Sequence, residues 1–486
     1  MACTTILVGK NASNDGSTMI ARNDDGHFDV KKLVVVEPKD QVKKYTSKIG
    51  KLTIEDLPEN PLRYTMIPNV DTSSGVWPAS GVNAYGVGMT ATETITSNPR
   101  VKGADPYVVP HEENGKQMPG GLGEEDLVLL VLPYIRSARE GVERLGALLE
   151  KYGTYEPNGI AFNDPDEIWW LETIGGHHWI ARRVPDDAYV MMPNQFGLDN
   201  FDFEDAYGAK KENMCSPDLC EFVEKNHLAL DQGKKFNPRL AFGSKADSDH
   251  VYNTPRAWYM MRYFNPRTFS YDGPNARYTP MSDDIPWSMV PESKITVEDV
   301  KYILSSYYQG TPYDPYSKSG DPSLHGIYRP IGISRTSFMT CLQARPNLPR
   351  EISTIEWLCM GANPFNAFVA IYPNVAKIPS YFSGTKKTVD SNSFYWANRL
   401  IGALADSHFH SSAIYIERYQ NKMQETNREH ILRTDKKYLE TKDLSVLETA
   451  NQDIASSAKR DTDAVLREVL NVASNAMKCG YSRSDN

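Results

Sequence analysis

Residues 3–25 of the chain read CTTILVGKNASNDGSTMIARNDD, and this stretch decides the fold prediction. A β-rich run, CTTILVG, is followed by the turn-forming residues NASNDGS and then by a second strand-like run, TMIAR. Two such runs on either side of a short turn region predict a β-hairpin over residues 3–22. The hairpin would place Cys3 at its open end, beside Arg22 and close to Asp25.

A thiol in this position has two interpretations. Cys3 is either a small apolar residue of the first strand or a nucleophile exposed when Met1 and Ala2 are removed. At a new N-terminus the thiol would attack, while the α-amine, with an ordinary pKa of about 8, accepted its proton. A nearby cation such as Arg22 would lower the pKa of both groups and favour the thiolate. For Arg22 and Asp25 the alternative is a surface ion pair, which contributes little to stability.

The composition is that of a globular protein with a sizeable core. The chain has 486 residues, of which 40% are hydrophobic and 24% charged, and its net charge is -9. Negative charge without a basic block argues against nonspecific nucleic-acid binding, and no run approaches the roughly 18 apolar residues of a membrane span. Lys10 and Asn11 interrupt the first apolar run, which argues against a signal peptide. We therefore expect a cytoplasmic protein without nucleic-acid or membrane partners.

No cysteine or histidine pattern indicates a metal site. The 6 cysteines contain no C-x-x-C, and the closest pair, Cys215 and Cys220, encloses Pro217. The histidine pairs in SHFHS and GGHHW lack a neighbouring cluster of cysteine or acidic residues. We expect free thiols and neither a metal ion nor another cofactor.

The predicted elements follow the order strands, helix, strands and a closing helical region. Apolar residues recur at helical spacing over 127–149, with Pro133 as a kink, and a second helix is expected over 296–308. Strands are predicted at about 351–374, and helices from about 391 to 486. This order fits an α+β layered protein.

The opening stretch resembles the N-terminal-nucleophile cysteine dipeptidases, the broad-specificity dipeptidase family of lactic acid bacteria, which is related to penicillin V acylase and conjugated bile acid hydrolase. The specific part is C-T-T, then D-G-S, then A-R-N-x-D, and the similarity continues through SGVNAYGVGMTATET, PDDAYVMMPNQF and NTPRAW. The resemblance implies a four-layer αββα N-terminal-nucleophile hydrolase sandwich with a helical C-terminal region, in a single domain over residues 1–486. It also implies autoprocessing and the hydrolysis of short peptides without metal.

The resemblance assigns roles residue by residue. Cys3 resembles the nucleophile, Arg22 would hold the thiolate, and Asp25 would bind the freed α-amine. Asn83 in GVNAYG matches one asparagine that supports the oxyanion. Asn194 in MMPNQF is the counterpart of a second, although its proline precedes the asparagine where that of the acylases follows it.

Arg256 in NTPRAW matches a further active-site arginine, or binds the substrate carboxylate if it does not serve the oxyanion. Fixed amide donors would suit the oxyanion, since each typically contributes about 3 kcal/mol. For Asn83 and Asn194 the alternative is turn formation next to Gly86 and Pro193.

Three functions remain open from the sequence. The first is a cysteine dipeptidase that hydrolyses unblocked dipeptides through a thioester on Cys3, after removal of Met1 and Ala2. The second is an amidase or acylase of the same fold that acts on N-acyl amino acids or bile-acid-like amides. The third is a non-catalytic binding protein in which Cys3 stays capped. The glycine- and proline-rich loop at 309–326 is predicted to lie at the surface or to cap a pocket, and a homo-oligomer is possible.

Overall fold

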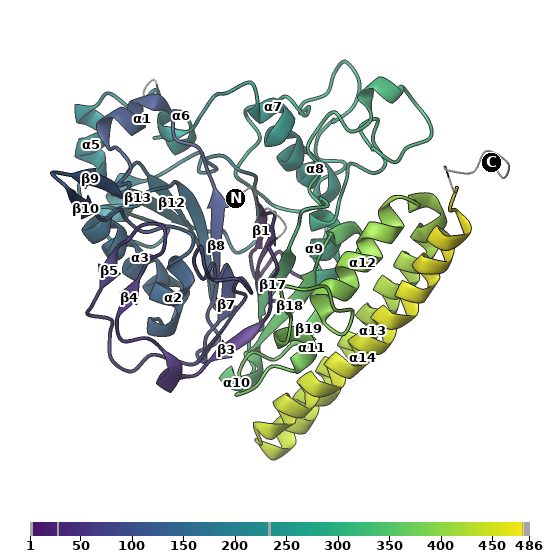
Figure 1. Ribbon diagram of the computed structural model, residues 1–486. Helices are drawn as coiled ribbons and strands as arrows, with labels where there is room; N and C mark the ends of the chain where they lie inside the picture. The colour runs from purple at the N-terminus through teal and green to yellow at the C-terminus, as the bar shows by residue number, and fades with distance from the viewer. Residues whose placement is uncertain (1–2, 27–28, 232–234, 479, 481–486) are drawn as a thin grey trace.

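The computed structural model describes residues 3–26, 29–231, 235–478 and 480, and two β-sheets form its centre (Figure 1). One sheet has seven strands and the other six, and neighbouring strands in both are antiparallel. In spatial order the first sheet contains β16 (Ser288–Met289), β14 (Tyr189–Met192), β1 (Thr4–Val8), β2 (Thr18–Asp24), β17 (Phe338–Ala344), β18 (Thr354–Met360) and β19 (Val369–Ile371). The second contains β15 (Asn213–Cys215), β13 (His178–Arg183), β12 (Ile168–Ile174), β11 (Asn158–Asn163), β8 (Gly88–Thr94) and β7 (Ser80–Val82).

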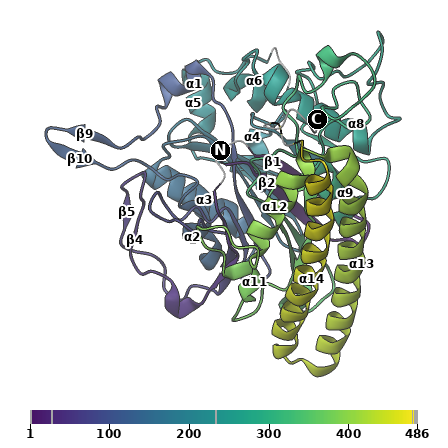
Figure 2. The same ribbon diagram turned by 45° about the vertical axis from the view of Figure 1, so that its right-hand side comes forward.

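Helices lie against the outer face of each sheet, and α13 and α14 run side by side as a long antiparallel pair (Figure 2). No helix in the described part of the chain combines the length and the apolar character that crossing a membrane requires. The helices are α1 (Pro99–Ala104), α2 (Leu127–Val131), α3 (Ala138–Tyr152), α4 (Phe203–Tyr207), α5 (Leu219–Lys225), α6 (Pro238–Phe242), α7 (Asp249–Tyr252), α8 (Thr254–Phe264), α9 (Val297–Leu304), α10 (Arg350–Ser353), α11 (Ser380–Ser383), α12 (Phe394–Asp406), α13 (Phe409–Thr441) and α14 (Ser445–Asn475). Three two-stranded sheets pair β9 (His111–Glu113) with β10 (Lys116–Met118), β3 (Val34–Val36) with β6 (Tyr64–Met66), and β4 (Tyr45–Thr46) with β5 (Thr53–Ile54).

Alternating side chains on the strands build three apolar layers. In β1, Leu7 joins the layer between the two sheets, whereas Ile6 and Val8 join the layer beneath the C-terminal helices. In β12, Trp170 points between the sheets and Trp169 lies beneath α2 and α3. Both helices and sheets therefore contribute to the core, and the predicted α+β class is confirmed.

The predicted hairpin is confirmed as β1 and β2, which pair with Thr5 opposite Arg22. The helix expected after residue 296 is also confirmed at its start. Thr296 and Asp299 form a capping box there, in which each side chain accepts a hydrogen bond from the other's backbone N–H. The helix ends earlier than predicted, at Leu304. Helices α12 to α14 fill most of the predicted C-terminal helical region.

The single kinked helix predicted over 127–149 is instead two helices. α2 gives way to the 3-10 turn Leu132–Tyr134, and α3 begins after Ser137, whose hydroxyl accepts a hydrogen bond from the Glu140 N–H. Pro133 has no N–H to continue the helix, and a serine at the N-cap favours a new start. Helical spacing persists across the break because both segments bury residues in the same apolar layer.

Two asparagines of the C-terminal helices pair the free edge of β19, the last strand of its sheet. Asn427 of α13 accepts a hydrogen bond from the Ala370 N–H and donates one to the Phe368 carbonyl. Asn451 of α14 does the same for the N–H and carbonyl of Tyr372. Both asparagines are buried. Their amides replace a neighbouring strand, so the helices close an edge that would otherwise be open to pairing.

We expect Asn451→Ala to lower the free energy of unfolding by about 2–4 kcal/mol. The change leaves a buried N–H and a buried carbonyl of Tyr372 unpaired, and each such group costs about 1–3 kcal/mol. Urea unfolding would measure the difference. Gln452→Ala, an exposed position on the same helix, is the matched control and should change stability by no more than about 0.5 kcal/mol. Equal stability of the two variants would contradict the proposed closure of the edge.

Candidate active site

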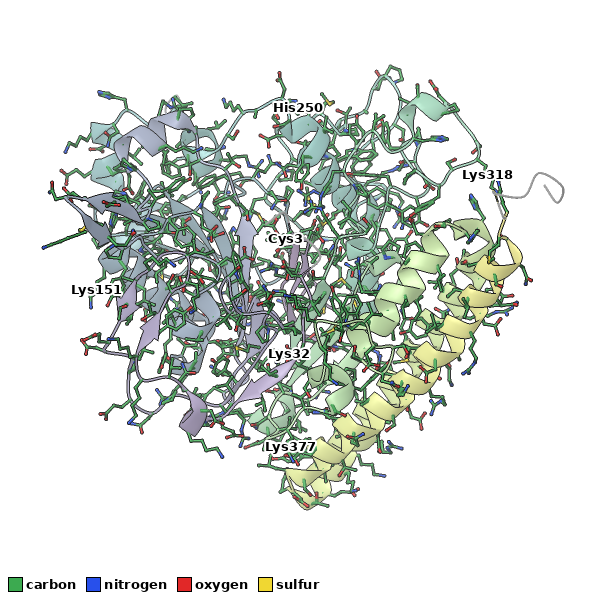
Figure 3. All side chains as sticks on the ribbon, viewed as in Figure 1. Cys3, Lys32, Lys151, His250, Lys318 and Lys377 are labelled. Atoms are coloured by element: carbon green, nitrogen blue, oxygen red, sulfur yellow. The ribbon has the colours of Figure 1, made fainter. Side chains whose placement is uncertain are left out.

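Cys3 lies directly before β1, and its side chain points into the layer between the two sheets. Arg22 Nη2 donates a hydrogen bond to Cys3 Sγ at 2.9 Å. Both side chains are fully buried. In Figure 3 Cys3 is near the centre of the molecule, while Lys151 and Lys377 lie at its edge. The hairpin therefore brings the predicted thiol and guanidinium into contact.

Arg22 belongs to a buried group of charged side chains. Its Nη2 lies 3.4 Å from Asp24 Oδ1 and 3.3 Å from Glu124 Oε1, and its Nη1 donates a hydrogen bond to the Ala79 carbonyl. Lys31 Nζ lies 3.2 Å from the other carboxylate oxygen of Asp24. Two cations thus balance two anions, which is the condition for burying them together.

Burial controls the acidity of the Cys3 thiol more strongly than the arginine does. Removal from water raises the pKa of Cys3 to about 12, and the positive charge of Arg22 opposes this rise only in part. The carboxylates of Glu93, Asp24 and Glu124 raise it further, because negative neighbours disfavour a thiolate. Arg22 therefore acts in the predicted direction, because it lowers the pKa of the thiol, but burial and the carboxylates outweigh it. A thiol with a raised pKa needs a base in order to attack.

Arg256, from α8, supports the backbone of Cys3. Its Nη1 donates hydrogen bonds to the Cys3 carbonyl at 2.5 Å and to the Thr4 hydroxyl at 2.6 Å. Its Nη2 donates to the side-chain oxygens of Asn194 and Asn253, both at 2.7 Å. The guanidinium is fully buried. The structure thus brings Arg256 together with Cys3 and Asn194.

Asn194 follows β14 and lies in the same cluster, but its amide donors are already used. Its Nδ2 donates hydrogen bonds to Glu93 Oε1 at 2.7 Å and to the Thr94 carbonyl at 3.0 Å. Its Oδ1 accepts the hydrogen bond from Arg256. A donor for an oxyanion would have to be released from one of these two partners.

Asn83 lies on the outer face of the second sheet, away from this cluster. Its neighbour Val82 points between the sheets, so Asn83 points outward, where Nδ2 donates hydrogen bonds to the carbonyls of Leu132 and Ile135. Its Oδ1 accepts hydrogen bonds from two backbone N–H groups of its own turn. The expected oxyanion role is therefore corrected. The side chain forms the turn and fastens it to the segment after α2.

Asp25 follows β2 and forms an ion pair with Arg329. Its other carboxylate oxygen accepts a hydrogen bond from the Thr336 hydroxyl at 2.6 Å, and Arg329 also donates one to the Thr4 hydroxyl. Asp25 is thus linked through one arginine to the residue next to Cys3. The amine that it is expected to bind arises only when the two residues before Cys3 are removed, and these lie outside the described residues.

The cluster contains five charged residues that the sequence did not predict as site residues, namely Asp24, Lys31, Glu93, Glu124 and Arg329. Strand alternation could have identified Asp24, because a period of two places it on the same face as Arg22. Glu93 in β8 and Glu124 before α2 are far along the chain from the hairpin, and no local pattern marks them.

Cys3, Asp24 and Glu124 have ligand atoms close enough together to hold a metal ion, and within the described ranges no other group of three does. Arg22 Nη2 lies within hydrogen-bonding distance of an atom of each. The guanidinium supplies the positive charge at this point, and it would repel a metal ion. The donor set therefore does not fit a metal centre.

The chain resembles a family of peptidases over most of its length. The family model described as "Peptidase family C69" matches residues 2–422. The "Dipeptidase" of Bifidobacterium longum is 56% identical over 429 residues, which cover 87% of this chain and 80% of that protein. "Probable dipeptidase A" of Streptococcus pyogenes serotype M3 is 48% identical over 489 residues, covering 100% of both chains. "Dipeptidase A" of Lactobacillus helveticus is 48% identical over 412 residues, or 84% of this chain and 82% of its own.

Among solved structures, a mutant of the conjugated bile acid hydrolase of Clostridium perfringens aligns with 78% of this chain and 99% of its own. The sequence identity is 13% and the TM-score is 0.27. At that score the superposition carries no argument about this chain.

We expect Arg22→Met to destabilise the fold by about 3–5 kcal/mol at pH 8, because it leaves buried carboxylates without their cation. Burial raises the pKa of Asp24. The positive charges of Lys31 and Arg22 more than offset this rise, and the net pKa lies below its ordinary value. Without Arg22, Asp24 takes up a proton more readily in the folded state, so the loss should be smaller at pH 5. Urea unfolding at both pH values would measure it.

Arg267→Met is the matched control for this change. Arg267 is highly exposed and pairs with Glu292 at the surface, so its loss should cost less than about 1 kcal/mol at either pH. If Arg22→Met were as mild as the control, the cluster would not depend on the buried guanidinium.

Proposed function

The chain belongs to peptidase family C69, and from this premise we propose that it is a cysteine dipeptidase. It would hydrolyse the peptide bond of unblocked dipeptides through a thioester on Cys3. The observation that carries the proposal is the Cys3 thiol, held 2.9 Å from the Arg22 guanidinium inside a charge-balanced cluster. The relatives named dipeptidases support the substrate class.

The proposed reaction needs a base that the thiol does not supply itself. Removal of Met1 and Ala2, which lie outside the described residues, would free the α-amine of Cys3. The amine takes the thiol proton while Sγ bonds to the scissile carbonyl carbon, and it then gives this proton to the leaving amine as the C–N bond breaks. Water, deprotonated by the same amine, attacks the thioester and releases the second amino acid together with the thiol.

The roles proposed for the other residues follow from their contacts. Arg22 holds the sulfur. Asp25, which is linked through Arg329 to the Thr4 hydroxyl, is proposed to bind the freed α-amine. Asn194 supports the oxyanion by releasing one of its two hydrogen bonds. Arg256 is a positioning residue, because it holds the Cys3 carbonyl and the Asn194 side chain in place. Asn83 has no part in the proposal, since its side chain is used in its own turn.

We also propose that the layers form the αββα sandwich of N-terminal-nucleophile hydrolases, as a single domain over residues 1–486. The three apolar layers support this arrangement. A cytoplasmic location is part of the proposal, and it is supported by the free thiols of Cys3, Cys215, Cys220, Cys341 and Cys359. Dipeptides are the proposed binding partners. Assembly of the protein into a homo-oligomer is also compatible with this function.

We expect the active protein to begin at Cys3, so its intact mass should lack Met1 and Ala2. Cys3→Ser should lose nearly all turnover, because a hydroxyl is a far weaker nucleophile at the same position. Mass spectrometry and a dipeptide hydrolysis assay would test both statements. Full activity in a protein that still begins at Ala2 would contradict the proposed maturation, because Cys3 would then have no free α-amine.

The matched control for Cys3→Ser is Cys341→Ser, a second buried cysteine of the same sheet that lies outside the cluster. It should remain active once folded. Activity should survive a strong chelator and disappear on thiol alkylation. Loss with chelator and indifference to alkylation would contradict thiol chemistry.

We expect unblocked dipeptides to be cleaved, and N-acetylation or C-amidation to reduce kcat/KM at least tenfold. Losing one charge-assisted hydrogen bond of roughly 1.5–3 kcal/mol produces a loss of that order. A panel of dipeptides, tripeptides and N-acyl amino acids would measure it. If N-acyl amino acids were cleaved as well as free dipeptides, the amidase alternative would replace the dipeptidase proposal.

A further inference from the structure

A buried carboxylate, Glu93 of β8, faces the nucleophile from the opposite sheet. Its Oε2 accepts a hydrogen bond from the Thr5 hydroxyl at 2.8 Å, and its Oε1 accepts one from Asn194 Nδ2 at 2.7 Å. Thr5 is two residues after Cys3 on the same face of the hairpin, which corresponds to about 7 Å along a strand. Glu93 is 1% exposed, so its carboxylate is held away from bulk water, and its charge raises the pKa of the Cys3 thiol.

Glu93 differs from the other carboxylates of the cluster in its partners. Asp24, Asp25 and Glu124 each pair with an arginine. Over the described part of the chain, no basic side chain lies within ion-pair distance of Glu93, about 4 Å. The two groups that bond to it, a hydroxyl and an amide, are both neutral. A buried carboxylate without a cation is unfavourable and is stabilised by any cation that reaches it.

The protonation of Glu93 is consistent with a site for a cation. Burial raises the pKa of Glu93 to about 7, and Arg256, which contacts the far side of Asn194, is the strongest of the opposing influences. The group therefore ionises near neutral pH. A cation beside it would lower this pKa and hold the carboxylate in its charged form.

The distances match the size of an amino-acid residue. An attacked carbonyl carbon lies about 3–3.5 Å from the nucleophilic sulfur. The α-nitrogen of the same residue is about 2.5 Å beyond that carbon, and a charge-assisted hydrogen bond adds about 2.8 Å. The sum, roughly 8 Å along a bent path, is comparable with the roughly 7 Å that separates Cys3 from Thr5, the residue that holds the Glu93 carboxylate, along the strand.

We propose that Glu93 binds the free α-ammonium group of the substrate and thereby selects unblocked dipeptides. The inference rests on the proposed dipeptidase function and names the residue that recognises the amine. An ammonium group would place a positive charge against the one carboxylate of the cluster that has no basic partner. An N-acylated substrate has no ammonium charge, so it would form no ion pair with Glu93 and would lose this contact.

The test compares Glu93→Gln with Glu356→Gln in the mature enzyme. Glu356 is a matched control, because it is buried, its pKa is raised to about 7 by burial, and it accepts a hydrogen bond from the Thr65 hydroxyl. Glutamine keeps the size of either side chain and can retain its hydrogen bonds. Each protein is assayed with a dipeptide, its N-acetyl derivative and the analogue in which hydrogen replaces the α-amine, and thermal unfolding verifies that it folds.

In the wild type, kcat/KM for the free dipeptide should exceed that for the des-amino analogue at least tenfold. Glu93→Gln should reduce this ratio at least tenfold, mainly through KM, while Glu356→Gln leaves it unchanged. Glu93→Asp, which keeps the charge but shortens the reach, should give an intermediate ratio.

Two outcomes would overturn the inference about Glu93 and leave the dipeptidase proposal intact. One is a wild type that prefers the free dipeptide and a Glu93→Gln variant that prefers it equally. The other is an equal loss on all three substrates, which would mean that Glu93 acts on the α-amine of Cys3. A wild type that does not discriminate at all would instead overturn the dipeptidase proposal. If Glu93→Gln failed to fold, the ratio in Glu93→Asp would decide between these outcomes.

Discussion

The buried guanidinium of Arg22 is the constraint on which the rest of the site depends. A cation between two sheets is stable only when anions surround it, and Asp24 and Glu124 supply them from β2 and from the segment before α2. Lys31 supplies the second positive charge that these two carboxylates need, through its contact with Asp24. The Ala79 carbonyl accepts a further hydrogen bond from Arg22. These contacts join the first hairpin to the opposite sheet. The same charges therefore fix the position of the thiol and the packing of the two sheets.

The surroundings of Cys3 also set what the thiol can do. Arg22 is one positive charge, whereas burial and three carboxylates all disfavour the thiolate. In the proposed mechanism the base belongs to the nucleophile itself, because an α-amine on Cys3 needs no separate element to position it. An N-terminal cysteine would therefore suit a site in which, among the described residues, no histidine contacts the thiol.

The local parts of this fold could be predicted from sequence, whereas the assembled site could be predicted only in part. Alternation and turn residues indicated the hairpin that joins Cys3 to Arg22, and the capping signal at Thr296 marked the start of α9. Long-range partners such as Glu93 could not be predicted, because no local pattern encodes which strand faces which across two sheets. Asn83 shows a different limit of prediction from sequence, because a local motif was read as a catalytic role. The motif G-x-N-x-x-G specifies a turn, and here the turn itself uses the amide.

Under the proposed function, the cluster would contact the two ends of a dipeptide differently. Every nitrogen of the Arg256 guanidinium donates a hydrogen bond within the protein, to backbone and side-chain oxygens around Cys3 and Asn194, so this arginine has no donor left for a substrate carboxylate. Glu93, in contrast, accepts its hydrogen bonds only from neutral groups, the Thr5 hydroxyl and the Asn194 amide. Under the proposed function, recognition of charge close to Cys3 is therefore concentrated at the amine end of the dipeptide. The carboxylate end would be bound by groups farther from Cys3.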